Sequence, residues 1–221
     1  MPLRRLVFIR PGETDWNLVG RWQGWVAIPL NDLGRVQVQR LANFIRNMGI
    51  SKLYSSDTRR AVDTAVILAE ALGFEPVFDQ RLRERSIGHW QGLTVPEIHG
   101  WYKEEYYQML QDPDNYRIPG GESLNDVRQR AEAVLQEIID QAIASEHETV
   151  GIISHTSSIV MMLKYLIPDI QLENVHFGNA SVTTVLRDEN GVYRTTAIND
   201  LSHLEGLEAR YMPLDVRGDD R

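Results

Sequence analysis

The chain has 221 residues, of which 43% are hydrophobic and 24% charged, and its formal net charge is -8 at pH 7. This length and composition suit one globular domain with a sizeable core, and the negative charge argues against a general nucleic-acid-binding or anionic-membrane surface. The absence of cysteine excludes disulfides, thiolate nucleophiles and Cys-ligated metal sites, and the apolar runs are too short for a membrane span or a signal peptide, so we expect a cytoplasmic protein.

The first segment, residues 4–9, is a short apolar run that predicts a buried strand. It leads into Arg10, after which Pro11 and Gly12 stop the strand, and the polar residues that follow suit a helix start. This order is typical of a buried strand that ends in a functional loop. Residues 1–60 also hold ten Lys and Arg against four Asp and Glu, which favours a local anion site, although scattered surface arginines would produce the same balance.

Helical and strand patterns then alternate as far as residue 78, with a helix at 32–48, a strand at 52–55, a helix at 57–72 and a strand at 76–78. Asn31 caps the first of these helices, and Gly49 ends it. Its apolar side chains at helical spacing are Val36, Leu41, Phe44, Ile45 and Met48.

Residues 79–121 break this alternation, because they are rich in Trp, Tyr and charge and show a helical pattern only around residues 95–110. The stretch is too long for a plain connection between sheet elements. We therefore predict a lid inserted over the active edge of the sheet, with an ordinary peripheral helix pair as the alternative.

The second half of the chain returns to alternation. A helix starts at Ser123 with a Ser-x-x-Asp pair resembling a capping box, and further elements are predicted at 149–154 (strand), 155–166 (helix), and 181–187 and 192–198 (a hairpin about the sequence DENG). Residues 205–221 lack periodicity and are interpreted as a tail. The whole predicts an α/β fold over residues 1–204, a three-layer sandwich whose central sheet is largely parallel and flanked by helices.

Polar residues stand where several of these strands end. Arg10 follows the first strand, Arg60 lies about one turn into the helix after the second, and His155 follows the strand at 149–154. Ligands in open α/β sheets bind at the carboxyl ends of the strands, so these side chains predict an anion site, helped by the helix N-terminus beside His155. Taken singly, each arginine also fits a surface salt bridge and the histidine fits a structural hydrogen bond.

Five segments, in this order and spacing, resemble the histidine phosphatase superfamily, the cofactor-dependent phosphoglycerate mutase-like phosphatases: RPGETDWN, LYSSDTRRAVDTA, LRERSIGHWQGLT, PGGES and ISHTSS. The resemblance covers nearly the whole chain, from Leu6 to about His203. It implies phosphoryl transfer through a phosphohistidine with no metal and no bound cofactor. It also implies roles for particular residues: Arg10, Asn17, Arg60 and His155 would hold the phosphate oxygens, and Glu84 and His155 would be the catalytic side chains, with Glu84 as general acid.

The nucleophile of this pattern is missing. In the family sequence Arg-His-Gly-Glu-Thr the attacking histidine takes the place of Pro11, and proline cannot accept a phosphoryl group. His155 is the obvious substitute, but its implied place beside an equatorial oxygen is not in line with the leaving group. Direct attack by water remains, at a loss on the order of 10⁴ to 10⁶ in rate.

Other positions also depart from the pattern, with Asp63 for a glutamine, Ala27 for an aspartate and Thr156 for a glycine. A carboxylate at Asp63 would weaken anion binding if it faced the pocket. Glu84 is flanked by three arginines, so a surface charge cluster is the alternative to its catalytic role. The PGGES segment is either a turn with a helix cap or part of the pocket rim.

Three functions follow as hypotheses. The first is a degenerate phosphatase that binds phosphate, a small phosphorylated ligand or a phosphoprotein; the second is a slow phosphomonoester hydrolase that works without a phosphohistidine. The third is a structural interaction protein whose arginines form salt bridges. Activity is expected to be absent or weak, and nucleic acid, membrane and metal are not expected as partners. Specificity would lie in residues 79–121.

Overall fold

The computed structural model describes residues 3–207 and contains one six-stranded sheet in the order β3-β2-β4-β1-β5-β6. The strands are β1 (Arg5–Ile9), β2 (Lys52–Ser55), β3 (Val77–Phe78), β4 (Thr149–Ile153), β5 (Val182–Arg187) and β6 (Tyr193–Asp200). The first four pair in parallel, whereas β5 and β6 form an antiparallel hairpin next to β1. The predicted largely parallel sheet is therefore confirmed, with a last strand that extends two residues further than expected.

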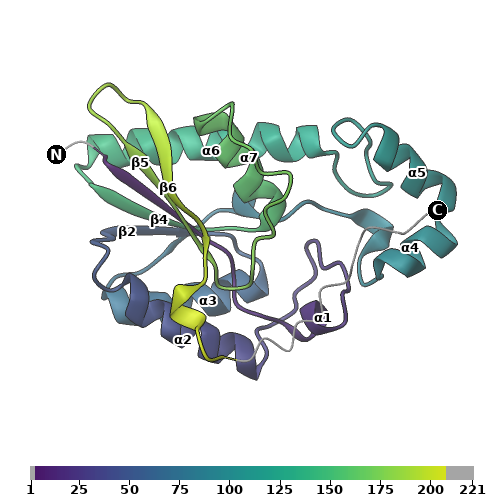
Figure 1. The fold of residues 1–221 in the computed structure, drawn as a ribbon, viewed down its shortest axis with the longest axis horizontal. Helices are drawn as coiled ribbons and strands as arrows, with labels where there is room; N and C mark the ends of the chain where they lie inside the picture. Colours follow the sequence, from purple (N-terminus) through teal and green to yellow (C-terminus); the bar gives the residue numbers. More distant parts are fainter. Residues whose placement is uncertain (1–2, 208–221) are drawn as a thin grey trace.

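Helices cover both faces of this sheet (Figure 1). They are α1 (Asp15–Leu18), α2 (Asp32–Ile45), α3 (Arg59–Leu72), α4 (Val95–Trp101), α5 (Lys103–Gln111), α6 (Leu124–Ala144) and α7 (Thr156–Leu166), joined by the short 3-10 helices η1 (Gln80–Leu82), η2 (Gly88–Trp90) and η3 (Ser202–Leu204). One apolar cluster joins the sheet to α2 and α3, and a second joins the opposite face to α6 and α7. These three layers are the predicted sandwich.

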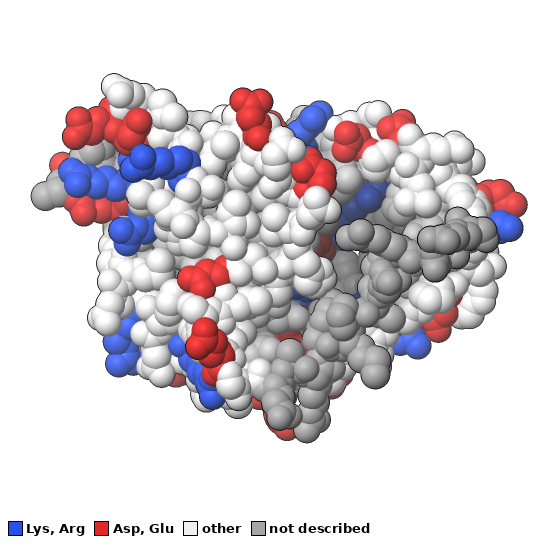
Figure 2. All heavy atoms as spheres, in the orientation of Figure 1, with Lys and Arg blue, Asp and Glu red and all other residues white. Residues whose placement is uncertain are grey.

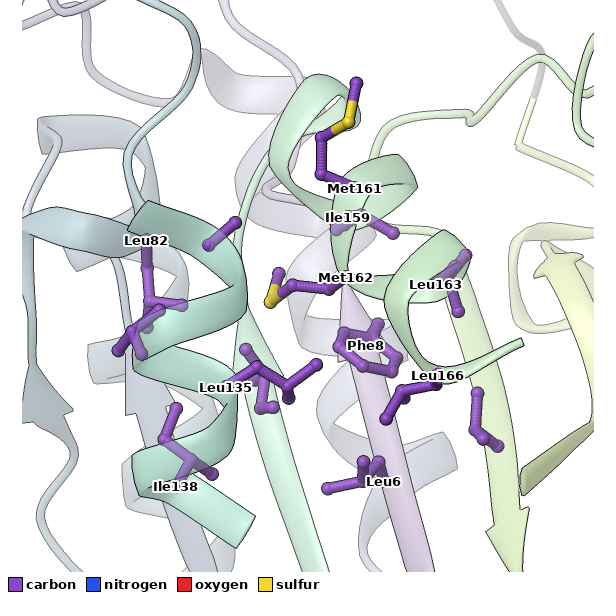
Figure 3. Packing of buried hydrophobic residues seen from close by; sticks show 14 of the residues in the cluster. Leu6, Phe8, Leu82, Leu135, Ile138, Ile159, Met161, Met162, Leu163 and Leu166 are labelled. Carbon is purple, nitrogen blue, oxygen red and sulfur yellow. The ribbon is translucent and has the colours of Figure 1, made fainter. Parts of the chain in front are cut away.

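The alternation of β1 explains how one strand serves both clusters. Successive side chains of a strand point to opposite faces, and Val7 and Ile9 accordingly pack with α2 and α3 while Leu6 and Phe8 pack with α6 and α7. Figure 3 shows Phe8 lying between side chains of α6 and α7. Because β1 is buried on both faces, the loop that follows it starts from a rigid base.

The helix starts differ in detail from the predictions. The Asn31 side chain accepts from the Gly34 N–H at 2.8 Å, which confirms the predicted cap. Val36 is 41% exposed, so its assignment to the apolar stripe is wrong; Val38 and Leu41 define the buried face, and at about 100° per residue Val36 points away from it. The second predicted helix begins at Arg59 rather than at residue 57.

Helices α4 and α5 lie away from the main layers, beyond the edge where the parallel strands end (Figure 1). They pack around a small apolar cluster of their own, formed by Ile87, Trp90, Ile98 and Ile118. A separate core of this kind lets residues 79–121 hold a shape of their own beside the sheet.

Within residues 3–207, no helix has the length and apolar character that a bilayer crossing requires. On the face drawn in Figure 2, acidic and basic side chains of the described residues are interspersed in small groups. The predicted tail at 205–221 falls outside the described residues from 208 onward.

Candidate functional site

A cavity of about 340 Å³ opens at the carboxyl edge of the parallel strands. The residues to which the sequence assigns catalytic or phosphate-binding roles all line it, together with the proline at the nucleophile position: Arg10, Pro11, Asn17, Arg60, Glu84 and His155. The structure therefore brings together residues from four separate parts of the chain. The rest of the wall consists of Gly12, Arg21, Trp22, Gln23, Gly24, Arg85, Ile87, Thr156, Ser157 and Asn179.

The loop after β1 supplies the first residues of the wall. The Arg10 N–H donates to the Ser181 carbonyl at 3.1 Å, and the Arg10 guanidinium donates to the carbonyl of Phe177. Pro11 is buried, and its carbonyl accepts from the Ala180 N–H at 2.9 Å. Since β1 ends at Ile9, the N–H that proline lacks lies outside the strand, and the sheet tolerates proline at this position.

The same loop is held against the start of α2. A Cβ added to Gly12 would lie 2.6 Å from the Gly34 carbonyl oxygen, so only glycine fits this approach. The Glu13 N–H donates to the Gln37 side chain at 3.0 Å, and the Glu13 carboxylate accepts from Asn31 at 2.9 Å. These contacts hold the backbone beside Pro11 in one position.

Asn17 lies in the short helix α1, which Thr14 caps. Its Oδ1 accepts from the Thr14 N–H at 3.0 Å, from the Thr14 hydroxyl at 2.9 Å and from the Asn179 amide at 3.2 Å. With its oxygen engaged in this way, the group that Asn17 offers to an anion is its Nδ2 amide.

Arg60 is a buried cation at the start of α3, only 5% exposed. It donates to the carbonyls of Gly24 at 2.9 Å and Val26 at 3.5 Å. Burial lowers the pKa of Arg60 to about 10; the carboxylate of Glu84 opposes this lowering, and the positive charge of Arg10 adds to it. The site therefore holds a guanidinium that lacks sufficient compensating negative charge.

Glu84 directs its carboxylate to the start of α7. It accepts from the Arg85 N–H at 2.7 Å and from the Ser157 N–H at 3.2 Å. The flanking arginines bind elsewhere: Arg81 pairs with Asp79 and Glu137, Arg83 pairs with Asp57, and Arg85 donates to the carbonyls of Glu122 and Tyr116. This geometry does not support the alternative of a surface charge cluster around Glu84.

His155 occupies the N-cap position of α7, where its side chain makes no capping hydrogen bond, and is 3% exposed. Its Nε2 lies 3.0 Å from the Thr58 hydroxyl and 3.0 Å from the Ser56 hydroxyl. Burial holds the pKa of His155 well below its usual value of 6.5, and the guanidinium groups of Arg60 and Arg10 lower it further. The imidazole is therefore neutral at pH 7.

The departures from the family pattern leave the cavity open to an anion. Asp63 turns away from it, since its carboxylate pairs with Arg59 at 2.8 Å and accepts from the Leu30 N–H at 3.2 Å. Thr156 lines the cavity, and the PGGES segment does not. In that segment Ser123 caps α6, so the turn-and-cap interpretation is the one the structure supports.

Arg21 and Asn179 line the cavity but were not singled out from the sequence. Arg21 pairs with Glu97 of α4 at 3.0 Å and so connects the cavity wall to the α4–α5 segment. Asn179 precedes β5, which runs antiparallel to β1 and therefore brings its amino end to this edge. Asn179 precedes its strand, so the rule that site residues follow the carboxyl ends of parallel strands does not predict its place at this edge.

Taken together, the wall offers guanidinium and amide donors beside a neutral imidazole, with Glu84 as the acidic member. Such a set suits the oxygens of a phosphate group, which guanidinium forks and N–H groups bind well. Within residues 3–207, no group of three or more His, Asp or Glu side chains is arranged to hold a metal ion.

Comparison with known proteins agrees with this picture. Residues 6–200 match the family model of the histidine phosphatase superfamily (branch 1). Phosphoglycerate mutase-like protein 4 of Arabidopsis thaliana is 34% identical over 204 residues, which cover 90% of this chain and 86% of the relative.

Two solved structures have similar folds and cover most of the chain. A mycobacterial glucosyl-3-phosphoglycerate phosphatase in complex with VO3 has a TM-score of 0.78 and 32% identity, covering 89% of this chain and 99% of that one. A histidine-to-alanine mutant of phosphoserine phosphatase from Entamoeba histolytica, in complex with phosphoserine, has a TM-score of 0.78 and 28% identity, covering 90% and 98%. The chain belongs to the histidine phosphatase superfamily, branch 1.

Proposed function

We propose that this protein binds the phosphate group of a small phosphorylated ligand and does not turn it over through a phosphohistidine. The observation that carries the proposal is the convergence of Arg10, Arg60 and His155 on a cavity in which Pro11 takes the place of a nucleophile. On this proposal the protein is a degenerate phosphatase that still binds the phosphate group but lacks the nucleophile that would accept it.

The electrostatics of the cavity support phosphate binding. Arg60 and Arg10 are close enough to disfavour each other's charge, and burial makes that charge more costly still. An anion placed between them offsets both their mutual repulsion and the cost of burying their charge. Opposite unit charges about 4 Å apart attract each other by on the order of 4 kcal/mol at an effective dielectric constant of about 20. A phosphate dianion is thus a natural occupant of the cavity.

The size of the cavity supports a small ligand. At about 340 Å³ it lies at the lower end of the roughly 300–1,000 Å³ typical of small-molecule pockets. The phosphoserine phosphatase mutant with one histidine changed to alanine was solved with phosphoserine bound. That relative therefore holds an intact phosphomonoester with a histidine removed, which is the behaviour proposed for this chain.

The test separates binding from turnover. Phosphoserine, 3-phosphoglycerate and inorganic phosphate are titrated into the native protein and into Arg60→Gln by calorimetry, while hydrolysis of the two esters is followed by phosphate release. The same release assay is run on Arg10→Ala, on Pro11→His and on Pro11→His combined with Arg10→Ala, and the combined variant reports contaminating phosphatase. We expect binding by the native protein, weaker binding by Arg60→Gln, and turnover by Pro11→His at least about 10⁴-fold above the native rate.

Two results would change the conclusion. Turnover by the native protein that is lost in Arg10→Ala would support the second hypothesis, slow hydrolysis without a phosphohistidine. No binding of any of the three probes by the native protein would contradict the proposal and favour the third hypothesis, in which the arginines have a purely structural role.

A further inference from the structure

A buried cluster of three polar groups lies behind the cavity. The Nε2 of His155 is 3.0 Å from the Ser56 hydroxyl and 3.0 Å from the Thr58 hydroxyl, and these two hydroxyl oxygens are 3.2 Å apart. The three residues are 3%, 0% and 5% exposed. Among the residues that the structure describes, the one other donor to this cluster is the Thr58 N–H, which donates to the Ser56 hydroxyl oxygen at 3.3 Å.

The hydrogen atoms of this triangle can be assigned by counting. If Nε2 accepts, one hydroxyl donates to it and the other donates to it or to its partner hydroxyl, so both hydroxyl protons are used. If Nε2 carries the proton, it can only donate, so neither hydroxyl can donate to it. The two hydroxyl protons then have one remaining contact, the one between the two hydroxyls, and that contact uses only one proton. One buried hydroxyl proton would then have no acceptor, and buried polar groups of this kind are strongly disfavoured.

We propose that Ser56 and Thr58 hold neutral His155 in the tautomer with its proton on Nδ1, which makes His155 a hydrogen-bond donor into the cavity and excludes it as a substitute nucleophile. Ser56 and Thr58 are positioning residues, since they act through the imidazole. The part of this inference that concerns the ligand rests on the proposed function, whereas the tautomer itself does not.

The direction of the ring supports the assignment. His155 lines the cavity, and Nε2 is turned to the hydroxyl pair behind it. No group among the described residues forms a hydrogen bond with Nδ1. This atom is also not fully buried. Nδ1 is therefore the ring nitrogen that a ligand in the cavity can reach.

The chemical consequence is a division of roles within one ring. A nucleophile or a general base needs a lone pair directed at the reacting atom. The one lone pair of neutral His155 faces Ser56 and Thr58, and the face toward the cavity carries N–H. The protein thus gains a neutral donor for a phosphate oxygen without adding a third positive charge beside Arg10 and Arg60.

The experiment reads the tautomer directly. The protein is labelled with ¹⁵N in its histidine rings, and the two-bond ¹H–¹⁵N spectrum is recorded at neutral pH without ligand, with His155 assigned from the loss of its signals in His155→Asn. We expect Nδ1 with the shift of a protonated ring nitrogen and Nε2 with that of an unprotonated one. The reverse pattern, or a doubly protonated ring, would overturn the proposal.

Variants and ligand then test the positioning role. In Ser56→Ala combined with Thr58→Val the tautomer preference is expected to be lost and inorganic phosphate to bind about tenfold more weakly, in line with the loss of a donor to a charged group. Thr58→Ser and the neighbouring Ser55→Ala are the matched controls, and both should keep the native pattern. Ser55 donates to the Ser56 carbonyl at 2.9 Å, and in the described part of the chain its hydroxyl forms no hydrogen bond with the imidazole.

A further measurement on the native protein covers the case in which the double variant does not fold. Inorganic phosphate titrated into the native protein should shift the Nδ1 signal of His155 more than its Nε2 signal, and the opposite order would overturn the inference. If phosphate does not bind at all, the proposed function fails, and with it the ligand part of the inference. The tautomer seen in the unliganded spectrum still tests, on its own, whether Ser56 and Thr58 hold the proton of His155 on Nδ1.

Discussion

Replacing Arg60 by glutamine is expected to stabilise the unliganded protein while it weakens phosphate binding. Arg60 is 5% exposed, and burial is the largest cause of the lowering of its pKa to about 10. A cation held in such a place stabilises a complex with an anion but destabilises the empty fold. Stability and binding should therefore change in opposite directions on substitution.

The magnitude follows from the pKa. The lowering of the pKa of Arg60 to about 10 corresponds to a destabilisation of about 3 kcal/mol, at about 1.4 kcal/mol for each pH unit. The folded protein binds the proton of Arg60 less tightly than the unfolded chain does, so the charge destabilises the fold. The penalty is fully present below about pH 10 and declines as the pH rises above about 10 toward the higher pKa of an arginine in the unfolded chain.

Part of the stability gained by removing the charge is offset by the loss of the hydrogen bonds that the Arg60 side chain makes. Arg60 donates to the carbonyls of Gly24 and Val26, at 2.9 and 3.5 Å, and losing both costs on the order of 1 to 2 kcal/mol. The net gain for Arg60→Gln is then about 1 to 2 kcal/mol. In a protein of this length that raises the melting temperature by roughly 2 to 8 °C.

Calorimetric unfolding at neutral pH measures this shift, with and without inorganic phosphate. The native protein should gain stability from phosphate, because a ligand at about 100 times its dissociation constant adds about 2.7 kcal/mol, and the variant should gain little. Arg128→Gln, in an exposed position of α6, is the matched control and should change neither value. A less stable Arg60→Gln, or an unchanged response to phosphate, would refute the reasoning.

Four further substitutions test the structure around the site. Gly34→Ala should destabilise the protein by about 1 to 3 kcal/mol, since its Cβ would lie 2.1 Å from a backbone oxygen of the loop after β1. Gly100→Ala, with open space around it in α4, should instead stabilise by about 0.5 to 1 kcal/mol in the same thermal assay, and equal effects would contradict this pairing. Arg130→Ala leaves the Glu122 carboxylate without its partner at 2.8 Å, and urea unfolding should show a loss of about 3 kcal/mol, whereas a loss below about 1 kcal/mol would mean that the pair contributes little. Ile98→Ala opens the buried cluster of the α4–α5 segment and should cost about 2 to 5 kcal/mol in urea unfolding; a midpoint equal to the native one would show that this segment unfolds separately from the sheet.

Much of the architecture follows from local patterns. The apolar run before Arg10, the cap at Asn31 and the alternation of helices with strands all appear in the structure with small shifts at their ends. The candidate site residues also come together as expected, because the carboxyl ends of parallel strands share one edge. Val36 is the exception among the apolar positions, since several adjacent hydrophobic residues allow more than one choice of buried face.

The sequence by itself determined the order of the elements, the family motifs and the presence of proline at position 11. It could not show that Asp63 turns toward Arg59 and away from the cavity, or that Asn179 reaches the site from the amino end of an antiparallel strand. Nor could it show that Nε2 of His155 faces the hydroxyls of Thr58 and Ser56, which lie 97 and 99 residues away in the chain. Helix and strand patterns arise from neighbours along the chain, whereas the direction of a side chain and the place of its proton depend on groups that only the tertiary fold brings into contact.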